Sequence, residues 1–128
     1  MGEAENIYIS INNDVVKIIA QGIDDQQFLI ELEEKLQLIQ SRVIPDTYLL
    51  LLIVRNEAFT SPRSIAKLVQ LLKQSHFVAL AIDLEECAYP AMIEQVCDKA
   101  FQTLALPYHV FFNQQDALQW LITVKSFN

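Results

Sequence analysis

The sequence predicts an α/β domain with a mixed, mostly parallel sheet and four helices, in the order β-β-α-β-α-β-α-β-α. Two observations carry this prediction. Uninterrupted apolar runs of strand length, at 48–54 and 77–84, are typical of parallel strands that are covered on both faces. Each run is followed by a segment with apolar residues at helical spacing, which is the pattern of crossover connections between parallel strands. The chain has 128 residues, so we expect a single domain over 1–128, with an ordered core from about residue 7 to residue 124.

The amino-terminal part is expected to form a β-hairpin. Residues 7–11 and 15–20 are rich in β-branched side chains, and Asn12-Asn13-Asp14 between them is typical of a turn. Gly22 follows the second strand, and we expect it to let the chain leave the sheet.

The first helix is predicted to begin at Asp24 or Asp25, since a carboxylate there accepts hydrogen bonds from the free N–H groups of the first turn. Apolar side chains then recur along one helical face, and Pro45 ends the segment. That apolar face consists of Phe28, Leu32, Leu36 and Ile39. We interpret the acidic stretch 24–34 and the basic stretch 55–73 as solvated helix faces.

The second half of the chain alternates between helices and strands. Ser61-Pro62 predicts the start of the second helix, and Pro90 the start of the third. Residues 108–112 form the last predicted strand, and a short helix begins at Asn113 or Gln114. The expected inner face of the second helix consists of Ile65, Leu68, Val69 and Leu72. That of the third helix consists of Ile93, Val96, Cys97, Ala100, Phe101 and Leu104, and that of the last helix of Ala117, Leu118, Leu121 and Ile122. Trp120 is expected to pack in the core or at its edge, and the alternative is an exposed interface anchor.

The net charge of −7 disfavours two classes of partner. Nucleic acids and anionic membrane surfaces both attract basic proteins, so we expect neither nucleic-acid binding nor stable membrane association. The longest apolar run, 48–54, is far shorter than a membrane span, and no secretory signal is evident at the acidic start. We therefore expect a cytoplasmic protein in which Cys87 and Cys97 are free thiols. The apolar content of 52% fits a well-filled core or, alternatively, an exposed apolar patch.

The chemistry-bearing residues do not form a recognisable catalytic set. Two glycines are too few for a phosphate-binding loop, so no nucleotide cofactor is expected. Cys87 is predicted near the carboxyl ends of the strands, whereas His76 and His109 lie near their amino ends, and a nucleophilic cysteine needs a nearby base. Neither the cysteines nor the histidines have metal-ligand spacing. We expect no catalytic, cofactor-binding or metal site, and hence no enzyme.

One candidate site remains, at Thr60-Ser61-Pro62-Arg63-Ser64 before the second helix. A phosphate on Ser61 would lie in the positive field of the helix start with Arg63 close by, so Ser61 is a candidate phospho-acceptor, with Thr60, Arg63 and Ser64 in the same interaction site. The alternative is that Ser61 simply caps the helix.

Three stretches together resemble the SpoIIAA-like STAS superfamily of anti-sigma-factor antagonists, in particular its divergent stand-alone branch. They are Gly22 with the acidic opening and the helix to Ile39, the segment 61–68 after the apolar strand, and Tyr108–Phe112 followed by Asp116-Ala117-Leu118-Gln119-Trp120-Leu121. The resemblance implies a mixed α/β fold, and Ser61 as the counterpart of a serine that a partner kinase phosphorylates. That serine belongs to an Asp-Ser-x-Gly motif, whereas here Thr60 precedes it and no glycine follows.

Taken together, these features predict a non-enzymatic regulatory or protein-interaction module. Its partner would be another protein, and self-association into a homodimer is a further expectation. The alternative is a carrier or sensor that holds a small apolar or lipid-like ligand between a helix and the sheet.

Overall fold

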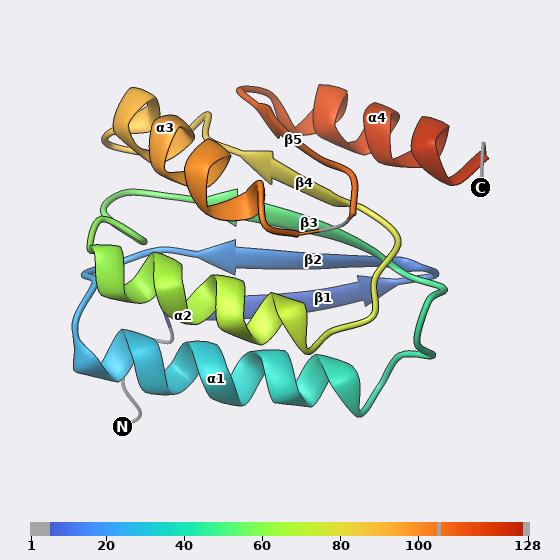
Figure 1. The fold of residues 1–128 in the computed structure, drawn as a ribbon, viewed down its shortest axis with the longest axis horizontal. Helices are drawn as coiled ribbons and strands as arrows, with labels where there is room; N and C mark the ends of the chain where they lie inside the picture. Colours follow the sequence, from blue (N-terminus) through green and yellow to red (C-terminus); the bar gives the residue numbers. More distant parts are fainter. Residues whose placement is uncertain (1–5, 105, 127–128) are drawn as a thin grey trace.

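The computed structural model describes residues 6–104 and 106–126, and over these residues it has the predicted order of strands and helices (Figure 1). The elements are β1 (Ile7–Asn12), β2 (Val15–Ala20), α1 (Gln26–Gln40), β3 (Leu49–Val54), α2 (Pro62–Lys73), β4 (Leu80–Asp83), α3 (Pro90–Phe101), β5 (Tyr108–Phe111) and α4 (Gln114–Ser126).

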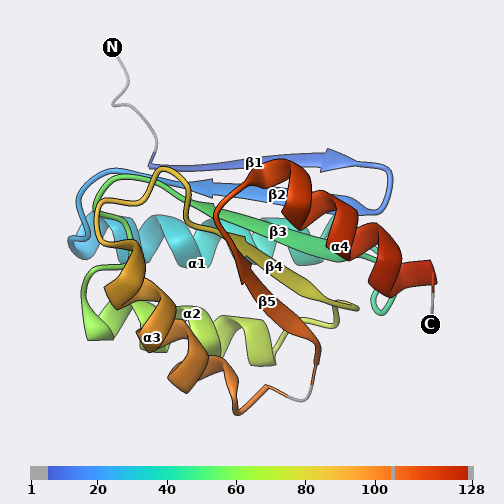
Figure 2. The ribbon, with the colours of Figure 1, turned by 90° about the horizontal axis from the view of Figure 1, so that it is seen from above.

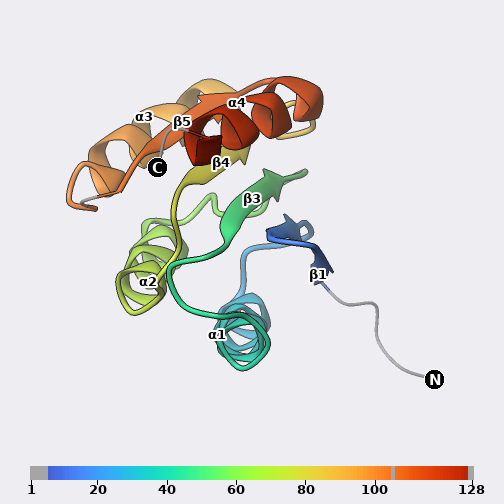
Figure 3. The ribbon, with the colours of Figure 1, turned by 90° about the vertical axis from the view of Figure 1, so that its right-hand side faces the viewer.

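The strands form one sheet in the order β1-β2-β3-β4-β5. β1 and β2 are antiparallel, and every later pair is parallel. Because each parallel crossover moves one strand along in the same direction, right-handed connections place α1, α2 and α3 on the same face of the sheet. α4 follows the last strand and covers the opposite face, so the molecule has three layers (Figures 2 and 3).

Both faces of the central strand β3 are buried, as its unbroken apolar sequence predicts. Leu50, Leu52 and Val54 belong to the larger core beneath α1, α2 and α3. Leu49, Leu51 and Ile53 belong to a smaller core in which Ala117 and Leu121 of α4 are buried. The two cores meet at the sheet, and they fix the carboxyl end of β3 from both sides.

Two tight connections use left-handed backbone conformations. Asn13 in the β1–β2 turn has φ +58°, and Gly22 after β2 has φ +93°. The positive φ of Gly22 favours glycine, and a Cβ atom at this position would also displace the side chain of Asn6, whose Oδ1 would lie 2.5 Å away. Gly22 therefore has the predicted role at the exit from the sheet.

Several boundaries and faces differ from the prediction. The strand expected over 77–84 is shorter: Phe77 and Leu84 are buried, but both lie outside β4. On α2, Val69 was expected on the buried face but is half-buried. Leu71, which was not expected there, is buried. Leu104 lies beyond the end of α3.

The prediction for the inner face of α4 was wrong at Ile122, which is 55% exposed. α4 packs on β3, β4 and β5, and Ile122 lines the groove between this helix and the β1–β2 hairpin. Trp120 instead packs beside His109 and Phe111 of β5, with ring centroids 5.9 Å and 5.7 Å away. This is the expected packing at the edge of the core.

Among the described residues, no helix has the length and apolarity that crossing a membrane requires.

Candidate functional site

The loop between β3 and α2 leaves the carboxyl end of the central parallel strand, which is where open α/β sheets usually place their functional residues. Asn56 and Phe59 in this loop both have left-handed backbones, with φ of +56° and +60°. Asparagine tolerates this conformation, whereas a bulky aromatic residue adopts it rarely and with strain.

Packing holds Phe59 in this strained conformation. Its ring is 1% exposed and makes an edge-to-face contact with Phe28 of α1, with centroids 5.1 Å apart. Ala58 beside it is fully buried, and the hydroxyl of Thr60 donates to the carbonyl of Glu57 at 2.9 Å. The loop is therefore rigid, and it presents Asn56 and Glu57 to solvent.

The first turn of α2 is built around Ser61. Its Oγ accepts a hydrogen bond from the backbone N–H of Ser64 at 3.2 Å, and Pro62 occupies the first helical position. Ser64 is completely buried, and its Oγ lies 2.9 Å from the carbonyl oxygen of Ser61. Ser61 thus has the capping role that the sequence suggested.

Asp24 ties this turn to the segment before α1. Its Oδ2 accepts from the Ser61 N–H at 2.7 Å and from the Ser64 hydroxyl at 2.6 Å. The neighbouring Asp25 caps α1 by accepting from the Phe28 N–H at 3.0 Å. Our interpretation of 24–34 as a solvated acidic face was therefore wrong for Asp24. The adjacent acidic pair was the only signal in the sequence, and it did not indicate that the two carboxylates serve different helices.

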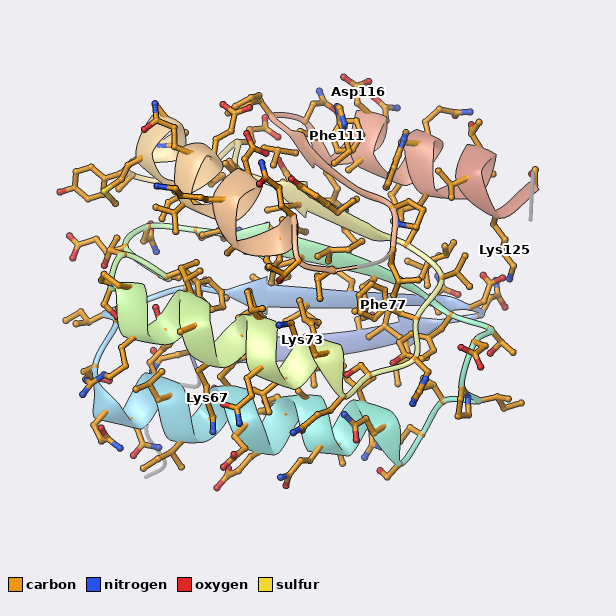
Figure 4. The ribbon with its side chains drawn as sticks, viewed as in Figure 1. Lys67, Lys73, Phe77, Phe111, Asp116 and Lys125 are labelled. Carbon is orange, nitrogen blue, oxygen red and sulfur yellow. The ribbon has the colours of Figure 1, made fainter. Side chains whose placement is uncertain are left out.

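All four predicted site residues lie in the loop or the first turn of α2, and hydrogen bonds join two of them, Ser61 and Ser64. Thr60 bonds to Glu57 instead, and Arg63 is exposed and lines a shallow groove between α1 and α2. Within the described residues, Arg63 forms no hydrogen bond with either serine. In this groove, Nζ of Lys67 lies 2.8 Å from Oε1 of Glu33 (Figure 4 labels Lys67).

A second loop, between β4 and α3, lies beside the first. Asn56 donates its N–H to the carbonyl of Glu86 at 3.0 Å and accepts from the N–H of Ala88 at 2.8 Å. Arg55 Nε lies 2.9 Å from Oε2 of Glu86. The carboxyl ends of β3 and β4 therefore carry one connected surface.

Asp83 ends β4 next to this surface and is 3% exposed. Its Oδ1 accepts from the N–H of Glu85 at 3.0 Å. Burial raises the pKa of the Asp83 carboxyl above its usual value, and the nearby carboxylates of Glu85 and Glu86 act in the same direction.

Both cysteines are free and buried. Burial raises the pKa of the Cys87 thiol, and raises that of Cys97 to about 12. The thiolate is the nucleophilic form, so burial makes both side chains poor nucleophiles at neutral pH. Over the ranges 6–104 and 106–126, the histidine, cysteine and acidic side chains form no group that could hold a metal ion.

Two further surfaces are hollowed. An open, apolar groove of about 330 Å³ lies between α2 and α3, lined by Pro62, Ile65, Ala66, Val96, Lys99 and Ala100. A groove of about 340 Å³ lies between α4 and the β1–β2 hairpin.

No protein-family model matches the sequence, and a comparison with curated proteins finds no significant match. Among solved structures, the chain is similar to an uncharacterised protein of the DUF3478 family with a SpoIIAA-like fold from Shewanella loihica PV-4. The two share 18% sequence identity with a TM-score of 0.62, over 94% of this chain and 99% of the other. Together with the sheet order and the four helices, this similarity shows that the chain has a SpoIIAA-like α/β fold, as the sequence resemblance predicted.

Proposed function

We propose that the chain is a regulatory protein-interaction domain whose partner binds the β3–α2 loop and the first five residues of α2. We call this region, residues 56–66, the loop–α2 surface. The observation that carries the proposal is the strained backbone of Phe59, which is kept in place by burial against Phe28. Strain of this kind persists where the surrounding structure enforces it, and it concentrates at functional sites.

The strain has a clear effect on the surface. With Phe59 turned into the core and Asp24 bonded to the start of α2, the backbone that carries the exposed residues Glu57, Pro62 and Arg63 is held in place in the absence of a partner. A rigid surface loses little conformational entropy on binding, which favours recognition by a protein.

The groove between α2 and α3 supports the same choice. It begins at Pro62, so it continues from the loop–α2 surface, and its apolar lining would accept an apolar side chain of the partner. The sequence resemblance to anti-sigma-factor antagonists adds to this, since it implies that Ser61 is the counterpart of the serine that a partner kinase modifies in those domains. Phosphorylation of Ser61 is accordingly part of the proposal, as the event that would change partner binding.

Photo-cross-linking tests the proposal. A benzophenone amino acid replaces Arg63 in one variant and Gln119, an exposed residue of α4, in a control variant, both expressed in the native cells. We expect one defined protein adduct from position 63 and none of the same mass from position 119. Identical adducts from both positions, or adducts from position 119 alone, would contradict the proposed surface.

Once the adduct is identified, a matched pair of variants of the purified protein tests the surface directly. Ala66→Tyr places a large side chain in the groove between α2 and α3, and Gln119→Tyr adds the same group to α4. We expect Ala66→Tyr to weaken binding at least tenfold and Gln119→Tyr to leave it unchanged. Equal effects of the two variants would count against the loop–α2 surface.

The groove beside α4 favours a second candidate function, the binding of a small apolar ligand. Leu51 of β3 contributes to its floor, and Val15, Leu118 and Ile122 add apolar walls. Its volume of about 340 Å³ is at the low end for small-molecule sites. A carrier with this site would hold its ligand between a helix and the sheet.

Native mass spectrometry of the purified protein tests this candidate. A carrier would retain a small co-purifying mass, and Leu118→Trp, which fills the groove, would lose it. The control Ile44→Trp enlarges a residue that is 71% exposed and does not line the groove. A ligand-free wild-type protein, or a ligand retained by Leu118→Trp, would contradict this site.

A further inference from the structure

The outer edge of β1 directs backbone groups away from the sheet. Gln21 donates its N–H to the carbonyl of Asn6, and the hairpin closes at the pair Asn12 and Val15. In an antiparallel pair, alternate residues direct their N–H and C=O groups to the neighbouring strand. The even-numbered residues of β1 therefore pair with β2, and the backbone groups of Ile7, Ile9 and Ile11 point outward.

Glu31 of α1 closes the beginning of this edge. Its Oε2 accepts from the N–H of Ile7 at 2.6 Å and from the N–H of Asn6 at 2.8 Å, and the side chain is 8% exposed. Over the part of the chain that the structure describes, no such partner reaches the outward groups of Ile9 and Ile11. The open part of the edge is therefore short and has a defined start.

Exposed apolar side chains flank the open part. Ile11 lies four residues beyond Ile7 on the strand, which is about 13 Å. Leu38 lies two helical turns beyond Glu31 on the same side of α1, which is about 10 Å. α1 and β1 run in the same direction (Figure 1), so Leu38 and Ile11 are displaced from the contact between Glu31 and Ile7 in the same direction and by similar distances. Each of these two side chains is 38% exposed, although both are large and apolar.

We propose that a second copy of this chain pairs with this edge, β1 against β1 in antiparallel orientation, with the two-fold axis at Ser10. Ile9 of each copy then exchanges two hydrogen bonds with Ile11 of the other, and the two sheets become one continuous sheet. The interface is isologous, as in most homodimers, because the same residues contribute from both copies.

The position of Glu31 selects this register. A register shifted so that Ile9 opposes Ile9 would also oppose Ile7 to Ile11, and the Ile7 N–H is already bonded to Glu31. In the register centred on Ser10, the residues that exchange hydrogen bonds are Ile9 and Ile11 of each copy, and Ile7, which is bonded to Glu31, is not needed. Strand addition to exposed edges is a general mode of recognition, and here the edge is its own complement.

The chemistry of the strand also fits a second copy. β1 has the sequence Ile-Tyr-Ile-Ser-Ile-Asn, so pairing opposes no like charges, although each chain has a net charge of −7. Tyr8, 39% exposed, would oppose Asn12 of the second copy. Two short strands and their flanks make a small interface, so the dimer dissociates on dilution. The proposal shares no residue with the loop–α2 surface and does not depend on it.

Disulfide cross-linking tests the register. Opposed residues in a pair without backbone hydrogen bonds have Cβ atoms close enough for a disulfide, and Ser10 opposes itself. We expect Ser10→Cys to form a covalent dimer under mild oxidation. Tyr8→Cys or Asn12→Cys alone should form this dimer far more slowly, because Tyr8 of one copy opposes Asn12 of the other and not itself. The double variant, which opposes a cysteine to a cysteine, should again form a covalent dimer. Wild type under the same oxidant controls for the two native thiols. A monomeric Ser10→Cys protein, or equal rates for Ser10→Cys and Tyr8→Cys, would overturn the register.

Sedimentation velocity at increasing protein concentration tests the dimer itself. We expect wild type to shift from monomer to dimer, and Ile11→Pro to stay monomeric, because proline removes an outward N–H that β2 does not use. Leu38→Lys provides a second, independent variant outside the sheet. The control Ile122→Lys removes an exposed apolar residue of α4 and should still dimerise. A wild-type monomer at the highest soluble concentration, or a dimer that persists in both edge variants, would overturn the proposal.

Discussion

Asp24 Oδ2 lies 2.6 Å from the buried Oγ of Ser64, and this hydrogen bond joins the segment before α1 to the start of α2 across 40 residues of sequence. The same oxygen accepts from the N–H of Ser61 at 2.7 Å. One carboxylate therefore satisfies two donors at the positive end of α2, where a negative charge is favourable. The loop–α2 surface depends on this contact for its position relative to α1.

Asp24→Ala should lower the free energy of unfolding by about 2 to 3 kcal/mol, because hydrogen bonds to a charged group contribute more than neutral ones and the Ser61 N–H loses its partner. Asp24→Asn retains one acceptor oxygen and should lose less. The measurement is urea unfolding followed by circular dichroism. Asp25→Ala is the matched control, and as a simple cap it should cost about 1 kcal/mol. Equal losses for the two alanine variants would show that Asp24 is only a local cap.

Ser61→Ala should cost about 1 kcal/mol through the lost cap. Ser61→Glu should cost more, since the new carboxylate lies near Asp24 and like charges repel, as a phosphate there would. In the Asp24→Asn background, the extra cost of Ser61→Glu should fall. A double-mutant cycle of unfolding free energies measures this coupling. Additive effects would mean that a charge on residue 61 does not sense Asp24.

The elements of the fold were predictable because their signals are local. The apolar run that contains β3, the Ser61-Pro62 start of α2 and the Asn12-Asn13-Asp14 turn each specify a structure within a few residues. The exceptions lie where tertiary packing decides. Ile122 has a suitable helical spacing for the core, but it lines the groove between α4 and the β1–β2 hairpin and is exposed.

The candidate site was predictable only in part. Ser61 as a helix cap follows from its neighbours, whereas the role of Asp24 depends on a contact with α2 that no local pattern reports. The left-handed backbone of Phe59 gave no signal either, since aromatic residues rarely adopt it and the ring of Phe28 holds it there. Glu31 occupies an acidic stretch typical of a solvated face, and its burial at the edge of β1 corrects that interpretation.

Asp83 should make stability depend on pH. Its carboxyl has a raised pKa in the folded chain, with burial as the main cause, whereas in the unfolded chain it titrates near its usual value, about pH 4. Between these two pKa values, the folded chain binds more protons than the unfolded chain. The contribution of Asp83 to stability is therefore fully present below the unfolded pKa and is lost as pH rises through the folded pKa.

Asp83→Asn removes this titration and keeps an oxygen that can accept from the Glu85 N–H. We expect the variant to be more stable than wild type at pH 7, by a difference that shrinks as the pH falls towards about 4. Urea unfolding across this range measures the difference. Asp116→Asn on α4 controls for the change in net charge, since Asp116 is exposed (Figure 4). A stability difference that does not vary with pH would contradict the assignment to Asp83.

Glu31→Ala should lower the free energy of unfolding by about 2 kcal/mol, because it leaves the N–H groups of Asn6 and Ile7 without their carboxylate at the edge of the core. Glu31→Gln keeps an acceptor oxygen and should lose less, whereas Glu33→Ala, which removes a half-exposed carboxylate paired with Lys67, should lose no more than about 1 kcal/mol.

Hydrogen exchange distinguishes this local role from a general loss of stability. In Glu31→Ala, the amide of Ile7 should exchange much faster, while amides in the centre of β3 should change only as far as the global free energy falls. Uniform acceleration of both strands would mean that Glu31 stabilises the chain without closing the edge of β1. Protection at Ile7 that survives the substitution would show that another group covers this edge, and would remove the reason for a pairing register centred on Ser10.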